Sequence, residues 1–187
     1  MLQSERRPLG FASVFAAMLC LTLTPRASAQ RAPVVVKARL LLSTDAVHAG
    51  GIAHAAIVAD IAPDYHINAH YPSLDYLIPT QLRLDPAKVF SAEKLSYPKG
   101  KPQKFAFSAT PLSVYEGKIE IGADLAVRRG VAPGEYPLRG ALTYQACNDR
   151  ECFPPTSVPV ALSVKIAAPH TPLHRINSEV FRTLAPE

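Results

Sequence analysis

The strongest constraint on the fold is a series of short apolar runs that alternate with polar residues and are separated by turn-forming residues. The run 118–127 shows the alternation best, with apolar side chains at Ile119, Ile121, Ala123, Leu125 and Val127. A period of two is typical of a strand with one buried face. Pairs of turn formers such as Pro133-Gly134 and Pro154-Pro155 stand between such runs. The pattern predicts strands joined by turns.

Segments of this kind recur along the chain. The predicted strands cover residues 34–42, 51–61, 80–84, 118–127, 136–146 and 158–166. No amphipathic helix of useful length lies between them, as a parallel α/β fold would require. About seven strands at this spacing indicate an antiparallel β-sandwich. Only residues 177–184 have a helical pattern, with Asn177 or Ser178 as the cap, and we expect a terminal turn or a frayed tail there.

The first residues have the layout of a secretory signal peptide. Arg6 and Arg7 precede the apolar stretch 11–23, and Ala27-Ser28-Ala29 follows it. This order predicts a signal peptide over residues 1–29, cleaved after Ala29. The apolar stretch has about thirteen residues, whereas a membrane-spanning helix needs about twenty. We therefore expect an exported protein with no membrane span after cleavage.

Cleavage leaves about 158 residues, enough for one domain with a real core. We expect a domain over residues 30–167 and a tail over residues 168–187, which could hold a short helix. Cleavage also removes Cys20, so Cys147 and Cys152 remain, and an even count suits an oxidising compartment. It lowers the formal charge from +5 to +3 and leaves no basic cluster, so no nucleic-acid partner is expected.

The two remaining cysteines lie in one short loop between two predicted strands. Four polar residues separate Cys147 from Cys152. Thiol–disulfide exchange needs two sulfurs within bonding distance and one thiolate exposed to a partner. A hairpin end would fix both backbones and keep the sulfurs near the surface. The spacing alone leaves three alternatives open: redox exchange, a structural disulfide, and half of a metal site.

Histidines suggest a second kind of site. His66 and His70 lie four residues apart, a spacing that places two metal ligands on one face of a helix. Pro63, Asn68 and Pro72 disfavour a helix here, so structural hydrogen bonding is the preferred interpretation, and no metal is expected. A hydrolase is disfavoured because there is no Gly-x-Ser-x-Gly motif and the cysteine pair has no evident histidine partner.

The cysteine segment resembles a known family. Residues 144–155, Tyr-Gln-Ala-Cys-Asn-Asp-Arg-Glu-Cys-Phe-Pro-Pro, are similar to the active-site segment of the N-terminal periplasmic domain of the thiol:disulfide interchange protein DsbD. Further similar segments lie at residues 65–69, 76–80, 97–100 and 115–117, and the similarity runs from about residue 34 to residue 166. The resemblance implies an immunoglobulin-like antiparallel β-sandwich with a redox-active cysteine pair.

The resemblance also implies a function. Domains of that family receive electrons from a membrane-embedded domain through a thioredoxin-like domain, and pass them to periplasmic disulfide isomerases and cytochrome c maturation proteins. By position, Cys152 would form mixed disulfides with partners and Cys147 would resolve them. Because the chain ends at Glu187, we expect a separate membrane electron donor. The expected activity is protein-disulfide reductase-type exchange in the periplasm, without a cofactor.

An aromatic cap over the cysteines is a further implication of the resemblance. Phe107 stands at the cap position and Phe105 is close by, although alternation in Phe105-Ala106-Phe107 equally suits strand core. Lys104 and Ala106 are in the stretch where the best-known members carry acidic residues, so a proton-shuttling role for those carboxylates is not transferred. Candidate partner-docking residues are Tyr144, Gln145 and Phe153, with Tyr65, Tyr71 and Tyr76 as further aromatics. The alternative function is a non-enzymatic secreted binding module with a structural hairpin disulfide.

Overall fold

The computed structural model describes residues 34–184. The predicted signal peptide, with Cys20, lies outside these residues. Among the described residues, no helix has the length and apolar character that a membrane crossing requires.

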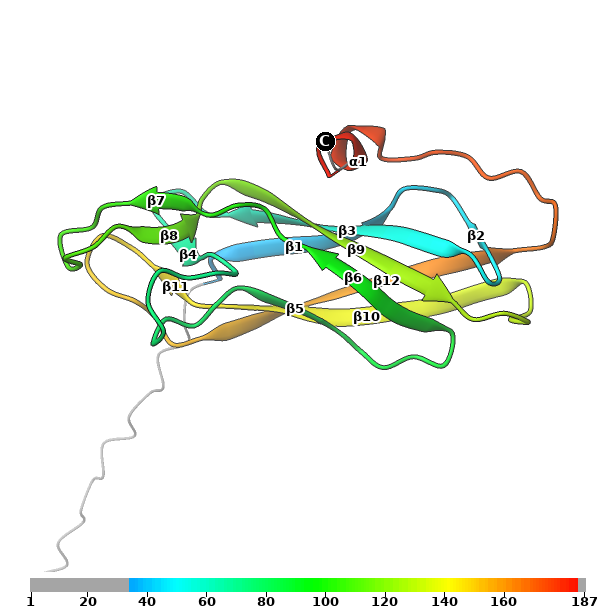
Figure 1. Ribbon diagram of the computed structural model, residues 1–187, viewed down its shortest axis with the longest axis horizontal. Coiled ribbons are helices and arrows are strands. Elements are labelled where there is room, and N and C mark those ends of the chain that lie inside the picture. The colour runs from blue at the N-terminus through cyan, green and yellow to red at the C-terminus, as the bar shows by residue number, and fades with distance from the viewer. Residues whose placement is uncertain (1–33, 185–187) are drawn as a thin grey trace, which may run out of the picture. The chain divides into compact units, whose positions relative to one another are not determined.

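The described part of the chain forms twelve strands and one helix, which are labelled in Figure 1. The elements are β1 (Val36–Leu42), β2 (Val47–His48), β3 (Ile52–Ile61), β4 (His66–Asn68), β5 (Gln81–Leu84), β6 (Phe90–Ser96), β7 (Lys101–Gln103), β8 (Leu112–Tyr115), β9 (Lys118–Val127), β10 (Gly134–Tyr144), β11 (Ala146–Cys147), β12 (Thr156–Ala167) and α1 (Ser178–Thr183). They build three four-stranded sheets, in the orders β1-β3-β9-β6, β2-β12-β10-β5 and β11-β4-β8-β7. Every pairing is antiparallel except the short parallel pair of β2 with β12.

The first two sheets pack face to face around one main core. Apolar residues at alternate positions of the strands form this core. In β9, Ile119, Ile121 and every second residue after them are buried. The second sheet contributes Leu138 and Leu142 from β10. The predicted immunoglobulin-like antiparallel β-sandwich is therefore confirmed.

Strand β3 is buried on both faces, which explains its many small residues. Ala55 and Ile57 belong to the main core, while Ala56 and Val58 pack on the opposite face against Val180 of α1. Alanine at the central positions leaves room for the helix to approach the sheet. The C-terminal segment crosses this outer face in Figure 1.

The short helix expected in the C-terminal tail is present, and of the two alternatives for residues 177–184 the terminal turn is right and the frayed tail is wrong, because α1 is packed. Val180 is buried, with Phe181 and Leu184 beside it. Asn177 precedes the helix in a left-handed conformation with φ of 54° and makes no capping hydrogen bond through its side chain. Its side-chain amide donates instead to the carbonyl of Leu42, at 2.9 Å. The cap residue thus ties the helix to β1.

All six predicted strands are present, with small shifts at their ends. The predicted run 136–146 is divided, because β10 ends at Tyr144 and β11 begins at Ala146. The sequence patterns missed β2 and β6 of the sandwich sheets. They also missed β4, β7 and β8, which form most of the third sheet. This small sheet lies at one end of the sandwich, on the left in Figure 1, and carries the cysteine pair.

Candidate active site: a disulfide at the end of the sandwich

Cys147 and Cys152 form a disulfide directly across a hairpin. The two residues are antiparallel bridge partners with Cα atoms 4.0 Å apart. The flanking backbone hydrogen bonds run from Phe153 N to Ala146 O, at 2.8 Å, and from Asn148 N to Glu151 O, at 2.9 Å. This pattern defines a non-hydrogen-bonded pair, in which Cα atoms approach to about 4.5 Å. The hairpin alone therefore holds both sulfurs within bonding distance.

The four-residue turn between the cysteines is ordered by one side chain. Asn148 Oδ1 accepts hydrogen bonds from the backbone nitrogens of Arg150, at 2.8 Å, and Glu151, at 2.9 Å. Asparagine stabilises tight turns in this way. The side chains of Asp149, Arg150 and Glu151 are exposed, so the turn presents mixed charge beside the disulfide.

The two cysteines differ sharply in exposure. Cys147 is fully buried, at 0% exposed, whereas Cys152 is exposed. The expectation that a hairpin end keeps both sulfurs near the surface was wrong for Cys147, because β11 is covered on its other side by β4. There Cys147 is paired with His66. Cys152, Cys147 and His66 therefore lie side by side, in that order, across three neighbouring chain segments.

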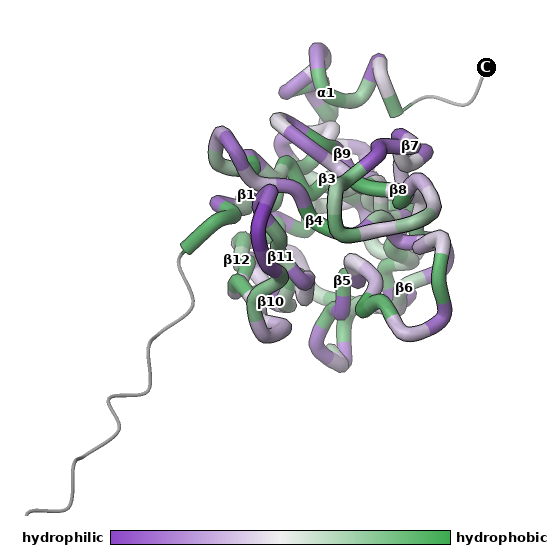
Figure 2. Tube along the Cα trace, turned by 90° about the vertical axis from the view of Figure 1, so that its left-hand side faces the viewer, coloured by the Kyte–Doolittle hydropathy of each residue, from purple (hydrophilic) through white to green (hydrophobic). Residues whose placement is uncertain are grey.

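The register of the third sheet separates its two faces. Ile67, Tyr115 and Ala146 occupy paired positions and pack into the main core. Neighbouring residues in a strand point to opposite faces. His66 and Cys147 therefore project from the outer face, and Figure 2 looks towards this end of the sandwich, with β4, β8 and β11 at the front.

His66 is a buried neighbour of Cys147. It is only 2% exposed, and its Nε2 atom has no hydrogen-bond partner. Burial lowers the pKa of His66 below its ordinary value, although the charges of Glu116 and Asp149 oppose the shift. Two sequence-based interpretations were therefore wrong: this histidine is not held at Nε2 by structural hydrogen bonding, and the cysteine pair does have a histidine neighbour.

A second small core covers this outer face. Phe105 is 9% exposed and stacks on His66 with a ring-centroid distance of 4.1 Å. Leu112 and Val114 of β8 and Leu77 of the 69–80 loop pack with it. The cover is therefore formed by two loops, 104–111 and 69–80, that lie far apart in sequence.

The two phenylalanines proposed for the cap have different positions. Phe105 packs directly on the histidine beside Cys147, whereas Phe107 is 46% exposed and stacks on Phe105 at 5.2 Å. The strand-core alternative was wrong for both, because residues 104–111 contain no strand. The three rings form a stack that runs from the surface to the buried strand β4.

Polar contacts fasten the 69–80 loop to the cysteine hairpin. Gln145 Oε1 accepts from Asn68 Nδ2, at 3.2 Å, and from Ile78 N, at 3.4 Å, and its own Nε2 donates to Phe153 O, at 3.3 Å. Thr80 Oγ1 donates to Asn68 O at 2.6 Å. Gln145, which we expected on a docking surface, is half-buried and links three segments.

The other docking candidates fall into two groups. Tyr144 is 2% exposed and belongs to the main core, so the expectation that it docks partners was wrong. Phe153 is half-buried next to the cysteines and packs near Tyr65, with ring centroids 5.9 Å apart. Tyr71 and Tyr76 in the 69–80 loop are exposed at 79% and 76%. Of these aromatic residues, Phe153 is the one that directly follows Cys152 in the chain.

No metal centre is formed within residues 34–184, where no three ligand-type side chains gather. His70 has the structural role expected of it, since its Nδ1 lies 2.9 Å from Thr80 O and its ring stacks on Tyr97 at 3.6 Å.

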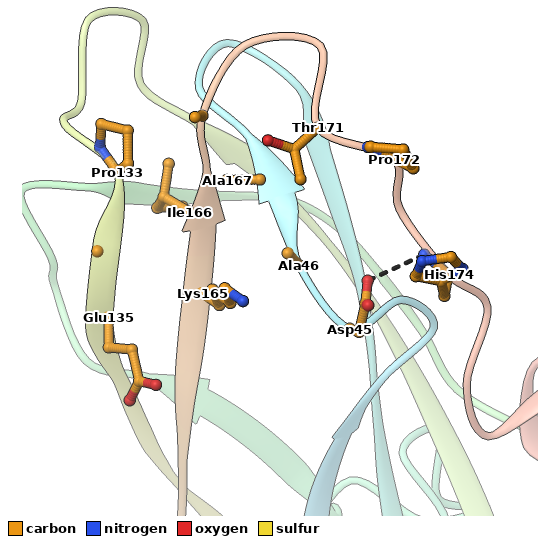
Figure 3. A pocket seen from close by; sticks show the side chains of 12 residues that line it. Asp45, Ala46, Pro133, Glu135, Lys165, Ile166, Ala167, Thr171, Pro172 and His174 are labelled. Atoms are coloured by element: carbon orange, nitrogen blue, oxygen red, sulfur yellow. Dashed lines mark hydrogen bonds between the residues drawn. The ribbon is translucent and has the colours of Figure 1, made fainter.

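A surface hollow lies near the opposite end of the sandwich, beside β2 and the end of β12. Figure 3 shows its lining, including Glu135, Lys165 and the contact in which His174 N donates to Asp45 Oδ1, at 2.9 Å. Neither cysteine of the disulfide lines it. The hollow is therefore not part of the cysteine site.

The fold and this site define a class: a small β-sandwich with a disulfide that exposes one sulfur at a hairpin end. The chain matches the family model described as thiol:disulfide interchange protein DsbD, N-terminal, over residues 37–163, and it belongs to that family. No curated protein sequence matches the chain.

Two solved structures are similar to parts of the chain. The reduced DsbD N-terminal domain of Neisseria meningitidis has 18% identity and a TM-score of 0.38, covering 73% of this chain and 89% of that one. The N-terminal periplasmic domain of ScsB from Proteus mirabilis has 12% identity and a TM-score of 0.40, covering 70% of this chain and 44% of that one. The family assignment rests on the family model.

Proposed function

We propose that this chain is a periplasmic thiol–disulfide interchange protein that passes two electrons to partner proteins through Cys147 and Cys152. The activity is protein-disulfide reductase-type exchange. The observation that carries the proposal is the difference in exposure within one disulfide, because a partner can reach Cys152 but not Cys147. Membership of the DsbD N-terminal family supports thiol–disulfide exchange as the chemistry.

The reduced protein would act in two steps. The Cys152 thiolate attacks one sulfur of the partner's disulfide, and the partner's other sulfur leaves as a thiolate and takes up a proton. The Cys147 thiolate then attacks Cys152, which closes the intramolecular disulfide and releases the second partner thiol. The protein loses two electrons and the partner gains two. Reversing these steps with a dithiol donor restores the reduced protein.

The proposed partners are thioredoxin-like or disulfide-isomerase proteins in the periplasm, with a membrane protein as electron donor. Exchange with such partners needs one accessible sulfur, which suits an exposed Cys152 with the half-buried Phe153 next to it. Phe153 beside the cysteines and Phe107 on the cap are the candidate contacts. Family membership and the predicted signal peptide support a periplasmic location, and cytochrome c maturation proteins are proposed acceptors on the family's pattern.

Single-cysteine variants test this function. The reduced variants are mixed with an oxidised disulfide isomerase of the thioredoxin fold and separated by non-reducing electrophoresis. Wild type should leave the isomerase reduced without a lasting adduct, whereas Cys147→Ala should accumulate a mixed disulfide through Cys152. Cys152→Ala should form no adduct, because the remaining sulfur is buried.

The alternative, a binding module with a structural disulfide, makes the opposite prediction. Non-covalent binding would then be equal in all variants, and no electrons would reach the isomerase. Equilibration of the protein with glutathione adds an independent measure, since a reduction potential below about −300 mV is typical of structural disulfides. Such a potential together with no adduct in Cys147→Ala would refute the proposed exchange.

A further inference from the structure

We infer that His66 accepts and returns the proton of Cys147 while the disulfide closes and opens. The inference rests on the proposed function and assigns the proton transfer that this buried sulfur needs. Three observations carry it: the strand register, the burial of both side chains, and a histidine nitrogen without a partner.

The register places the two side chains together. Cys147 and His66 are direct antiparallel partners of β11 and β4. Directly opposed residues share a face of the sheet, with Cβ atoms about 4.5–5.5 Å apart. The imidazole is therefore within reach of the sulfur on the outer face of the third sheet.

The same face holds an unusual concentration of unpaired polar atoms. Within residues 34–184, two buried side-chain atoms lack a hydrogen-bond partner, and these are His66 Nε2 and Asn68 Oδ1. Asn68 lies two residues along β4 and therefore projects from the same face. Buried polar groups are nearly always paired, so an unpaired nitrogen on His66, directly opposite Cys147, marks a site where a partner appears at another stage.

The sulfur supplies that partner when the disulfide opens. In the oxidised protein the Cys147 sulfur is bonded to Cys152 and carries neither proton nor charge. When a donor thiolate attacks Cys152, the S–S bond breaks and Cys147 becomes a buried leaving group with a full negative charge. Burial raises the free energy of a thiolate steeply, so a proton or a hydrogen-bond donor is needed at that point.

The surroundings of His66 suit such proton transfer. Phe105 covers one face of its ring and excludes water. Burial favours the neutral ring, whereas Glu116 and Asp149 favour the protonated one, and burial is the larger effect. The fold with an intact disulfide therefore favours the neutral ring, and a thiolate beside it would add a third negative charge that raises the proton affinity of the ring.

The transfer is balanced in both directions. During electron donation, the Cys147 thiol gives its proton to His66 Nε2, and the resulting thiolate attacks the Cys152–partner disulfide. The new S–S bond displaces the partner's sulfur, which leaves as a thiolate and is reprotonated from His66 or from water. During reduction by a donor, the charge growing on Cys147 raises the proton affinity of His66, which takes up the proton that the donor thiol has lost and passes it to the leaving Cys147 thiolate.

The resolving step can be isolated with a small disulfide, 5,5′-dithiobis(2-nitrobenzoate). Reaction of the reduced protein should release one coloured thiolate as Cys152 is modified and a second as Cys147 closes the disulfide. We expect His66→Gln to slow the second phase at least tenfold at pH 7 and to remove the inflection that the histidine contributes to its pH profile, leaving the steady rise in rate with pH that a thiol gives on its own. The first phase should change less than twofold.

A matched control uses the exposed His54, whose Nδ1 lies 2.7 Å from Asp124 Oδ1 on the sandwich sheet. His54→Gln should leave both phases unchanged. A second phase with unaltered rate and pH profile in His66→Gln would overturn the inference. Release of a single thiolate by the wild type would instead refute the proposed function, so the two failures are distinguishable.

Nuclear magnetic resonance of the wild-type histidine rings gives a test that does not depend on a variant folding. His66 should titrate at different pH values in the oxidised and reduced proteins, and in the reduced protein its titration should coincide with that of Cys147. Identical His66 titrations in both redox states would overturn the inference. The rings of His54 and His70 serve as internal references.

Discussion

Reduction of the disulfide should weaken the fold only slightly. The two cysteines are five residues apart, so the bond closes a very short loop. The loop-length relation assigns about 2 kcal/mol to a loop of this size. A domain of this kind has a total stability of about 5–15 kcal/mol. We therefore expect the reduced protein to remain folded, as interchange requires.

Urea unfolding of the oxidised and reduced proteins, followed by far-ultraviolet circular dichroism, measures this difference. For a slope of about 2 kcal/mol/M, a loss of about 2 kcal/mol lowers the midpoint by about 1 M. The slope itself should change little. Cys152→Ala is the matched control, because Cys152 is exposed and its removal breaks the bond with little loss of packing. It should reproduce the stability of the reduced protein.

Two results would contradict this reasoning. A loss of cooperative unfolding on reduction would show that the fold depends on the bond. A destabilisation of more than about 4 kcal/mol would exceed what so short a loop can contribute through chain entropy. Either result would favour the structural-disulfide alternative over interchange.

Three further predictions concern the cover, the buried histidine and the helix. Phe105→Ala should lower the free energy of unfolding by about 3 kcal/mol and speed reduction of the disulfide by dithiothreitol. Phe107→Ala should lower the free energy of unfolding by about 1 kcal/mol. Urea unfolding measures the loss of stability, and thiol kinetics measure the rate of reduction. Because the pKa of His66 is lowered by folding, the unfolded chain binds its proton first, so stability should fall as pH drops below about 6.5. His66→Gln should reduce that fall in a pH series of unfolding curves. Val180→Ala should lower the free energy of unfolding by about 1.5 kcal/mol, since each buried methylene contributes about 0.8 kcal/mol. The rate of disulfide reduction should not change.

Most long strands of the sandwich were predictable because they carry their own pattern, whereas β6 was missed because most of its residues are exposed. Strand β9 alternates along its whole length, and its predicted bounds, 118–127, match the structure. The short strands of the third sheet have no such signal. His66-Ile67-Asn68 has two polar residues on its outer face, and these are buried only because a distant loop covers them. Burial of that kind is a tertiary effect that a local pattern does not contain.

The sequence allowed us to predict the two cysteines of the site, but not the residues that surround them. The spacing of Cys147 and Cys152 left a disulfide and half of a metal site open, and the structure contains a disulfide. The pairing of Cys147 with His66 joins positions about eighty residues apart, so no spacing rule could suggest it. The sequence offered one signal. Ile67 is apolar and suits the main core, so its neighbour His66 would point to the opposite face of the strand. Only the cover formed by Phe105 shows that this second face is buried too.

The order of the proposed reaction follows from the place of each residue in the sheet. Cys152 is joined to the sheet by a single bridge at its edge, and the residue is exposed. Cys147 has a neighbour on each side, Cys152 on one and His66 on the other. An incoming thiolate therefore meets Cys152, and the charge displaced from the broken bond appears on Cys147, next to the histidine. In the proposed reaction, the places of the two cysteines in the sheet therefore determine which sulfur is attacked and where the charge moves.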